Sequence, residues 1–112
     1  MFRSGAFVAR HLDGLTEEGL RPEQVQPNGV DLTLGAVHEQ TCPGRIDRDG
    51  TSVGDRTARE PEDGVYRLDP GAYVVEYGEP VRIPREHVGF VYPRSSLLRN
   101  SCMLNTAVWD AS

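Results

Sequence analysis

The hydrophobic residues of this chain follow a helical spacing only near the N-terminus. A helix over residues 4–15 would place five side chains on one face, namely Phe7, Val8, His11, Leu12 and Leu15. Ser4 is a suitable N-cap for this helix, and Gly14 favours an end near Asp13. The pattern therefore predicts one short N-terminal helix.

Beyond residue 24 the pattern changes to short apolar runs separated by turns that contain Gly and Pro. Residues 30–34 alternate with a period of two after a turn at 27–29, and residues 36–39 extend that run. Further strands are expected at residues 65–68, 72–77, 81–84, 88–92 and 103–109. Short strands at this spacing are typical of an all-β sandwich or barrel.

Residues 40–64 interrupt this series with a polar stretch that contains only two large aliphatic residues, Ile46 and Val53. A connection of that length is uncommon in a compact domain and is either functional or mobile. We expect it to lie on the surface between two strands. The 112 residues are enough for one small domain with a single core.

The charge balance restricts the ligands of this chain. It has 12 basic residues, all of them Arg, and 17 acidic residues, for a net charge of −5. Such a chain lacks the broad basic face that nucleic acids require, so any polyanion must be held by a few positioned arginines. Without an apolar stretch long enough for a signal peptide or a membrane span, the chain is predicted to be cytoplasmic.

Two cysteines give neither a disulfide framework nor the spacing of metal ligands. We interpret both as reduced thiols, with Cys42 in a loop and Cys102 packed in the interior.

The segment Pro93-Arg94-Ser95-Ser96-Leu97-Leu98-Arg99 carries the clearest chemistry. It follows the apolar run 88–92, which the pattern predicts to be a buried strand. Guanidinium groups suit phosphate oxygens, and serine hydroxyls can fill the remaining acceptor sites. Taken alone, the segment is equally compatible with a corner between a strand and a turn, with its arginines in solvent.

Two carboxylates stand beside apolar runs elsewhere in the chain. Asp31 lies within the predicted strand 30–34, where a charge is costly unless it is paired or hydrogen-bonded. The alternative is an outward-facing residue on an alternating strand. Asp110 follows the run 103–109, and by itself it would be an ordinary polar residue near the end of the sequence.

Taken in order, these segments resemble the dCTP deaminase/dUTPase superfamily, in its deaminase-like branch and with the character of archaeal dUTPases. The matching segments are QPNGVDLTLG at 26–35, YRLDPG at 66–71, Ile83-Pro84 with Gly89 following, Arg94 to Arg99, and Asp110.

The resemblance implies a distorted jelly roll, the dUTPase-like β-clip, that assembles as a homotrimer with active sites between subunits. Family members continue after the counterpart of Asp110 with further strands. The resemblance therefore also implies that residues 1–112 form one partial domain, incomplete at the C-terminus.

The resemblance further implies a role for each site residue. Asp31 would lie near the Mg²⁺–triphosphate, and Arg94, Ser95 and Ser96 would grip the phosphates. Arg99 would also reach the triphosphate, and Asp110 would orient the attacking water and contact the sugar. In this family Mg²⁺ arrives with the nucleotide, so no separate protein metal site is expected. The scattered histidines do not match the ligand pattern of a zinc deaminase.

Three functions follow from this resemblance. The favoured one is hydrolysis of dUTP to dUMP and diphosphate, because residues 105–109 lack the histidine often found before the aspartate in bacterial deaminases. The second is a dCTP deaminase, either monofunctional or bifunctional, which would need a glutamate beyond residue 112. The third is a catalytically inactive protein that binds nucleotides. The sequence leaves the choice among them open, together with the role of residues 40–64.

Overall fold

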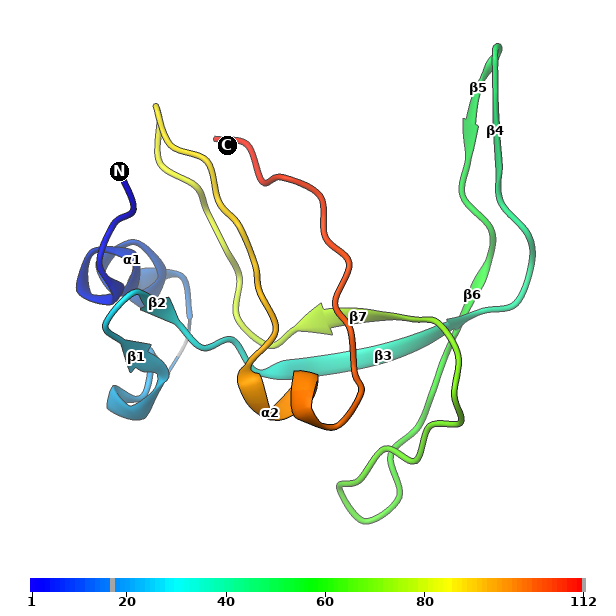
Figure 1. Cartoon of the computed structure of the whole chain (residues 1–112), viewed down its shortest axis with the longest axis horizontal. Helices are drawn as coiled ribbons and strands as arrows, with labels where there is room; N and C mark the ends of the chain where they lie inside the picture. The colour runs from blue at the N-terminus through cyan, green and yellow to red at the C-terminus, as the bar shows by residue number, and fades with distance from the viewer. Residues whose placement is uncertain (17, 112) are drawn as a thin grey trace. The chain divides into compact units, whose positions relative to one another are not determined.

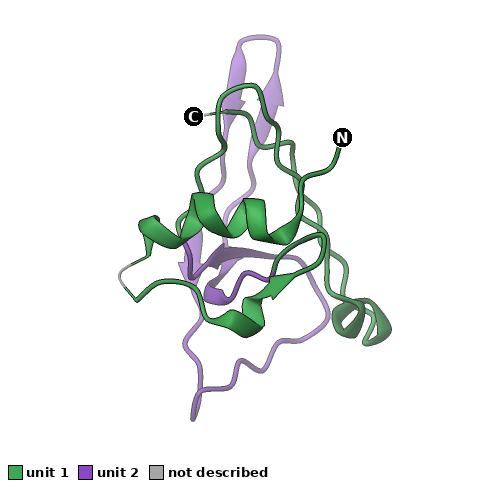
Figure 2. Ribbon diagram, turned by 90° about the vertical axis from the view of Figure 1, so that its left-hand side faces the viewer, with its two compact units in different colours: residues 1–30, 80–112 green, residues 31–79 purple. Residues whose placement is uncertain are grey.

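A computed structural model of the chain describes residues 1–16 and 18–111. Its helices and strands are labelled in Figure 1, and Figure 2 colours the two compact units into which they fall. Unit 1 comprises residues 1–30 and 80–112, and unit 2 comprises residues 31–79. The interpretation of the whole chain as one domain stays a prediction.

In unit 1 the expected N-terminal helix is present as α1 (Gly5–Leu12). The Ser4 hydroxyl oxygen accepts a hydrogen bond from the N–H of Phe7, which satisfies one of the N–H groups that a helix start leaves unpaired. The helix ends where the N–H of Asp13 bonds to the carbonyl of Ala9, and the 3₁₀ turn η1 (Asp13–Leu15) follows. The predicted N-cap and end of the helix are confirmed.

The helix packs on a small hairpin of the same unit. A second 3₁₀ turn, η2 (Pro22–Gln24), leads into β1 (Val25–Gln26), which pairs with β2 (Gly29–Val30) across the predicted turn. The N–H of Gly5 donates to the carbonyl of Pro27 at 3.0 Å. A Cβ on Gly5 would lie 1.6 Å from the carbonyl oxygen of Gln26, so only glycine permits this approach.

Unit 2 is built on a three-stranded antiparallel sheet in the order β6-β3-β7. The central strand β3 (Leu34–Gln40) lies between β6 (Arg56–Ala58) and β7 (Tyr73–Tyr77). Val37 in β3 is only 1% exposed and pairs with Val75 in β7. The strands predicted from residues 36–39 and 72–77 are confirmed.

The polar stretch 40–64 is partly regular in structure. Residues 41–53 are exposed, as expected, and they include the hairpin of β4 (Arg45–Asp47) and β5 (Gly50–Ser52). The prediction missed β6, which brings the stretch back to pair with β3. A three-residue strand, here Arg-Thr-Ala, is too short to show a period in the sequence.

Several predicted strands are extended segments without a continuous ladder. Residues 81–84 have no assigned strand, and segments 65–68 and 88–92 contribute only the isolated pairs Glu62–Val65 and Gly89–Trp109. Those strand predictions, including the one for 103–109, were wrong because a strand needs backbone partners along its length as well as an apolar pattern. The broader prediction of an all-β chain with a short N-terminal helix is confirmed. Among the described residues, the longest helices fall well short of the length and apolar character needed to cross a membrane.

Candidate functional site

The arginine- and serine-rich segment forms a one-turn helix, α2 (Ser95–Arg99), which the sequence did not predict. Arg94 is its N-cap in an extended conformation, and its carbonyl accepts hydrogen bonds from the N–H groups of Leu97 and Leu98. The side-chain amide of Asn100 donates to the Ser96 carbonyl at 2.8 Å and helps to end the helix. Arg94, Ser95, Ser96 and Arg99 are all exposed, so their polar groups are accessible to a ligand.

The segments on either side of α2 run antiparallel to each other within unit 1. Gly89 and Trp109 exchange two backbone hydrogen bonds of 2.8 and 3.0 Å, and the hydroxyl of Thr106 donates to the Val91 carbonyl. In Figure 1, α2 lies at the turn between these segments. The chain therefore presents the arginines and serines at the tip of an irregular hairpin, which we call the α2 arm (residues 88–110).

The prediction that residues 88–92 form a buried strand was wrong. Val88 is 57% exposed, Phe90 51% and Tyr92 74%. Cys102 was also expected to be packed, yet it is exposed because it lies in the turn that follows α2. An apolar run predicts burial only where other elements cover it, and within the described residues these side chains lack that cover.

Asp110 borders an open groove of about 400 Å³ at the base of the α2 arm. The other lining residues are mostly apolar, namely Val81, Ile83, Val108 and Trp109. Gly89 lies against Ile83, since a Cβ on this glycine would come within 2.6 Å of the Ile83 Cδ1 atom. Asp110 thus combines an exposed carboxylate with an apolar surface large enough for part of a small molecule.

Arg94 and Asp110 lie far apart along the α2 arm. The isolated pair Gly89–Trp109 brings Asp110 close to Val88, whereas Arg94 lies six residues beyond Val88 along the arm, at the start of α2. Six residues of extended chain separate Val88 from Arg94, which corresponds to about 20 Å. One copy of the arm therefore holds the arginines and serines of α2 at one end and the Asp110 carboxylate at the other, and does not bring them together.

Asp31 belongs to unit 2 and lies outside any strand. The strand β2 ends at Val30 and β3 begins at Leu34, so the prediction of a continuous strand over 30–34 was wrong. Asp31 is half-buried. Arg94 and Asp110 belong to unit 1, and the membership of Asp31 in a common site with them stays a prediction.

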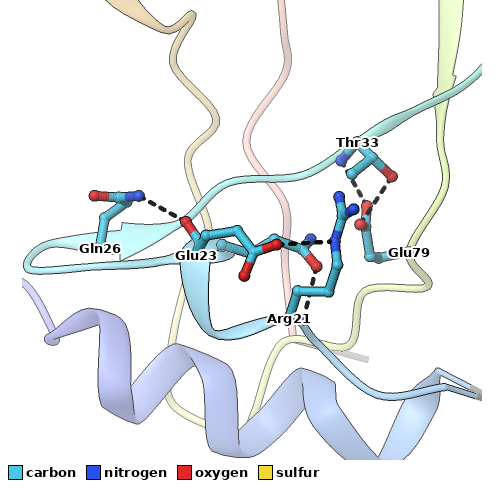
Figure 3. A network of polar contacts seen from close by, with 6 residues as sticks. Arg21, Glu23, Gln26, Thr33 and Glu79 are labelled. Carbon is cyan, nitrogen blue, oxygen red and sulfur yellow. Dashed lines mark hydrogen bonds and ion pairs between the residues drawn. The ribbon is translucent and has the colours of Figure 1, made fainter.

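Two residues after Asp31, Thr33 is held by a carboxylate that the sequence did not single out. Glu79 accepts hydrogen bonds from the Thr33 N–H at 2.7 Å and from the Thr33 hydroxyl at 2.9 Å. Figure 3 shows both oxygens of Glu79 turned toward Thr33. No sequence pattern marks a pair separated by 46 positions. Of the apolar groove residues, the sequence marks Val81 only as part of a predicted strand, and Ile83 also as part of a segment that matches the family.

Among the titratable groups of unit 2, Tyr77 has a pKa that is shifted from its ordinary value. Burial raises the pKa of its phenol above the usual value of 10.0, because the charged phenolate loses hydration. Tyr77 is the residue of β7 that pairs with Leu34 at the start of β3.

Comparison with known proteins identifies the family. The model of the dCTP deaminase-like family matches residues 2–111. The chain belongs to the dCTP deaminase-like family. This result confirms the resemblance that residues 26–35, 66–71, 94–99 and Asp110 indicate in the sequence.

Several curated proteins of archaea are similar to this chain. A protein of Halobacterium salinarum named "Probable deoxyuridine 5'-triphosphate nucleotidohydrolase" is 53% identical over 117 residues, which cover 99% of this chain and 68% of the relative. Proteins of the same name from Aeropyrum pernix and Methanococcoides burtonii are 46% and 45% identical over 77% and 79% of this chain. The matched part is 54% of the length of each of these two proteins. No solved structure matches the chain significantly.

Proposed function

We propose that this chain is a dUTP diphosphatase, which hydrolyses dUTP to dUMP and diphosphate, and that it acts in the cytoplasm. The observation that carries the proposal is the 53% identity, over 99% of the chain, to a relative named as a probable dUTP nucleotidohydrolase. The candidate residues Asp31, Arg94, Ser95, Ser96, Arg99 and Asp110 all lie inside the matched family region.

The triphosphate binds, in this proposal, to the tip of the α2 arm. Arg94 and Arg99 supply guanidinium groups that neutralise phosphate charge, and the hydroxyls of Ser95 and Ser96 donate hydrogen bonds to phosphate oxygens. All four side chains are exposed at one helical turn, which lets them reach one extended polyanion. Charge neutralisation at this point also stabilises the transition state of phosphate cleavage.

Asp110 orients the attacking water. A carboxylate within hydrogen-bond distance of a water molecule can align it and accept its proton. The groove of Val81, Ile83 and Val108 beside Asp110 suits the uncharged face of a deoxyribose, which lacks the hydroxyl that would need a polar partner there.

Mg²⁺ is the cofactor that the family resemblance implies. Asp31 fits this ion chemically, because its carboxylate supplies the hard oxygen atoms that Mg²⁺ prefers. Residues 1–16 and 18–111 contain no group of three or more His, Cys, Asp or Glu side chains placed to hold a metal by themselves. A metal that shares its coordination with phosphate oxygens and water needs only one such carboxylate. When bound, Mg²⁺ would neutralise charge on the triphosphate.

The complete site lies between copies of the chain, in a homotrimer. This part of the proposal is supported by the register of the α2 arm, which keeps Arg94 and Asp110 about 20 Å apart in one copy. Hydrolysis requires the phosphate ligands and the water-orienting carboxylate at the same phosphate group. A neighbouring copy can supply the carboxylate that the first copy holds too far away.

Release of diphosphate from dUTP with Mg²⁺ tests this function. Arg94→Ala should weaken binding of the triphosphate by about 1–3 kcal/mol, the scale of a lost charged hydrogen bond. Asp110→Asn should bind a non-hydrolysable dUTP analogue nearly as well as the parent but release little diphosphate. Arg48→Ala, which removes an exposed arginine from the β4–β5 turn, is the matched control and should be neutral.

The family model's description favours one other activity, deamination of dCTP. Ammonia release from dCTP, measured beside diphosphate release from dUTP, distinguishes the two reactions. Ammonia without diphosphate would replace the proposed function. A protein that binds the analogue in calorimetry but turns over neither nucleotide would be a binding protein only.

A further inference from the structure

The carboxylate of Glu79 holds the backbone just after Asp31 by a two-point contact. One oxygen accepts from the Thr33 N–H at 2.7 Å, and the other accepts from the Thr33 hydroxyl at 2.9 Å. Both residues are half-buried. Hydrogen bonds to an ionised carboxylate are shorter and stronger than those between neutral groups, and two of them fix orientation as well as distance.

A third hydrogen bond reinforces this contact. The N–H of Gly78 donates to the carbonyl of Thr33 at 2.8 Å, so both backbone groups of Thr33 are bonded to residues 78–79. A Cβ on Gly78 would lie 2.5 Å from the Thr33 hydroxyl oxygen, which means that this close approach depends on glycine. We call these three bonds the Thr33 clamp (Thr33, Gly78 and Glu79).

The clamp lies beyond the end of the regular sheet. The ladder between β3 and β7 finishes at the pair Leu34–Tyr77, after an irregularity between Leu34 and Ala36. Residues 31–33 have no strand pairing of their own. The clamp therefore holds the backbone at Thr33, two residues after Asp31, where the ladder of the sheet no longer does so.

We propose that Glu79 is a positioning residue, which fixes the conformation of residues 31–33 through Thr33 and thereby sets the place of the Asp31 carboxylate. This inference rests on the proposed function, in which Asp31 serves the Mg²⁺–triphosphate. A carboxylate on an unanchored segment spends only part of its time in the productive geometry, and small displacements of such groups reduce activity strongly.

Hydrogen exchange tests the clamp without any ligand. In the full chain, Glu79→Ala should accelerate exchange of the Thr33 amide by about tenfold or more, because its acceptor is gone. Thr33→Ser keeps the N–H and the hydroxyl and should exchange like the parent. Glu76→Ala removes a carboxylate that lies within β7 and is paired with His38, and it should leave the exchange of the Thr33 amide unchanged. If Glu79→Ala does not accelerate exchange at Thr33, the inference is wrong, whatever the binding data show.

Calorimetric titration with Mg²⁺ and a non-hydrolysable dUTP analogue tests the role of the clamp. Glu79→Ala should raise the Kd about tenfold, and Thr33→Val, which loses one bond of the clamp, should raise it by a smaller factor. Thr33→Ser and Glu76→Ala should bind like the parent. In an Asp31→Asn background, Glu79→Ala should change the Kd by less than about twofold, because the group that it positions no longer acts. Glu79→Gln keeps the shape of the side chain and serves where the alanine variant fails to fold.

The double variant separates positioning from a general effect on stability. Equal effects of Glu79→Ala in the parent and in the Asp31→Asn background would show that Glu79 acts independently of Asp31 and would overturn the inference. If Asp31→Asn binds like the parent, the role of Asp31 in the proposed function is wrong and the inference fails with it. If Asp31→Asn binds weakly while Glu79→Ala binds normally, the proposed role of Asp31 stands and only the inference fails.

Discussion

Mixing two inactive variants would show whether the site is shared between copies. Arg94→Ala removes a phosphate ligand from the tip of the α2 arm, and Asp110→Asn removes the water-orienting carboxylate from its base. Each variant alone should release little diphosphate from dUTP. The register of the arm puts these positions about 20 Å apart in one chain, so in our proposal each site takes them from two different copies.

The expected recovery follows from random assembly. The two variants are unfolded and refolded together in equal amounts. Half of the chains then carry Arg94, and the other half carry Asp110. A site needs both, so about a quarter of the sites should be intact and the mixture should regain about a quarter of the parent activity. The assay is diphosphate release from dUTP with Mg²⁺, at a fixed total protein concentration.

A second pair of variants controls for effects of mixing itself. Arg94 and Arg99 belong to the same α2 helix, so every site in a mixture of Arg94→Ala and Arg99→Ala lacks one of them. This mixture should stay as inactive as its components. A mixture of Arg94→Ala and Asp110→Asn that is no more active than either variant alone would refute a site shared between copies.

Three further predictions concern the fold. Val37→Ala should lower the free energy of unfolding in urea by about 2 kcal/mol, from the carbon atoms removed from a fully buried site plus the cavity that they leave. Gly5→Ala should cost about 2 kcal/mol or more in the same assay, because its methyl group would overlap the Gln26 carbonyl. The raised pKa of Tyr77 means that the unfolded chain loses its phenol proton first, so stability should fall as the pH rises above 10.0. Tyr77→Phe should remove this part of the loss of stability at high pH. If the urea midpoint of the variant falls with pH as steeply as that of the parent, the prediction is wrong.

The sequence contained enough local information to predict the elements that depend on neighbouring residues. Ser4 caps α1, Asp13 ends it, and the turn at 27–29 joins β1 to β2, because each of these features is decided by side-chain and backbone contacts within a few residues. The ordered motifs also led to the correct family, since the types of residue that suit a nucleotide are visible without coordinates.

Contacts between distant residues required the tertiary structure. The clamp joins Thr33 to Glu79 across 46 positions, and the pair Gly89–Trp109 sets the distance between Arg94 and Asp110. The exposure of Phe90 and Tyr92 likewise depends on what covers them. The sequence by itself determined the local turns, the helix cap and the chemistry of the site residues, because these depend on residue type and short-range geometry. Only the tertiary structure decided which of these residues meet, because pairing over long separations depends on the register of strands, which a period of two leaves undefined.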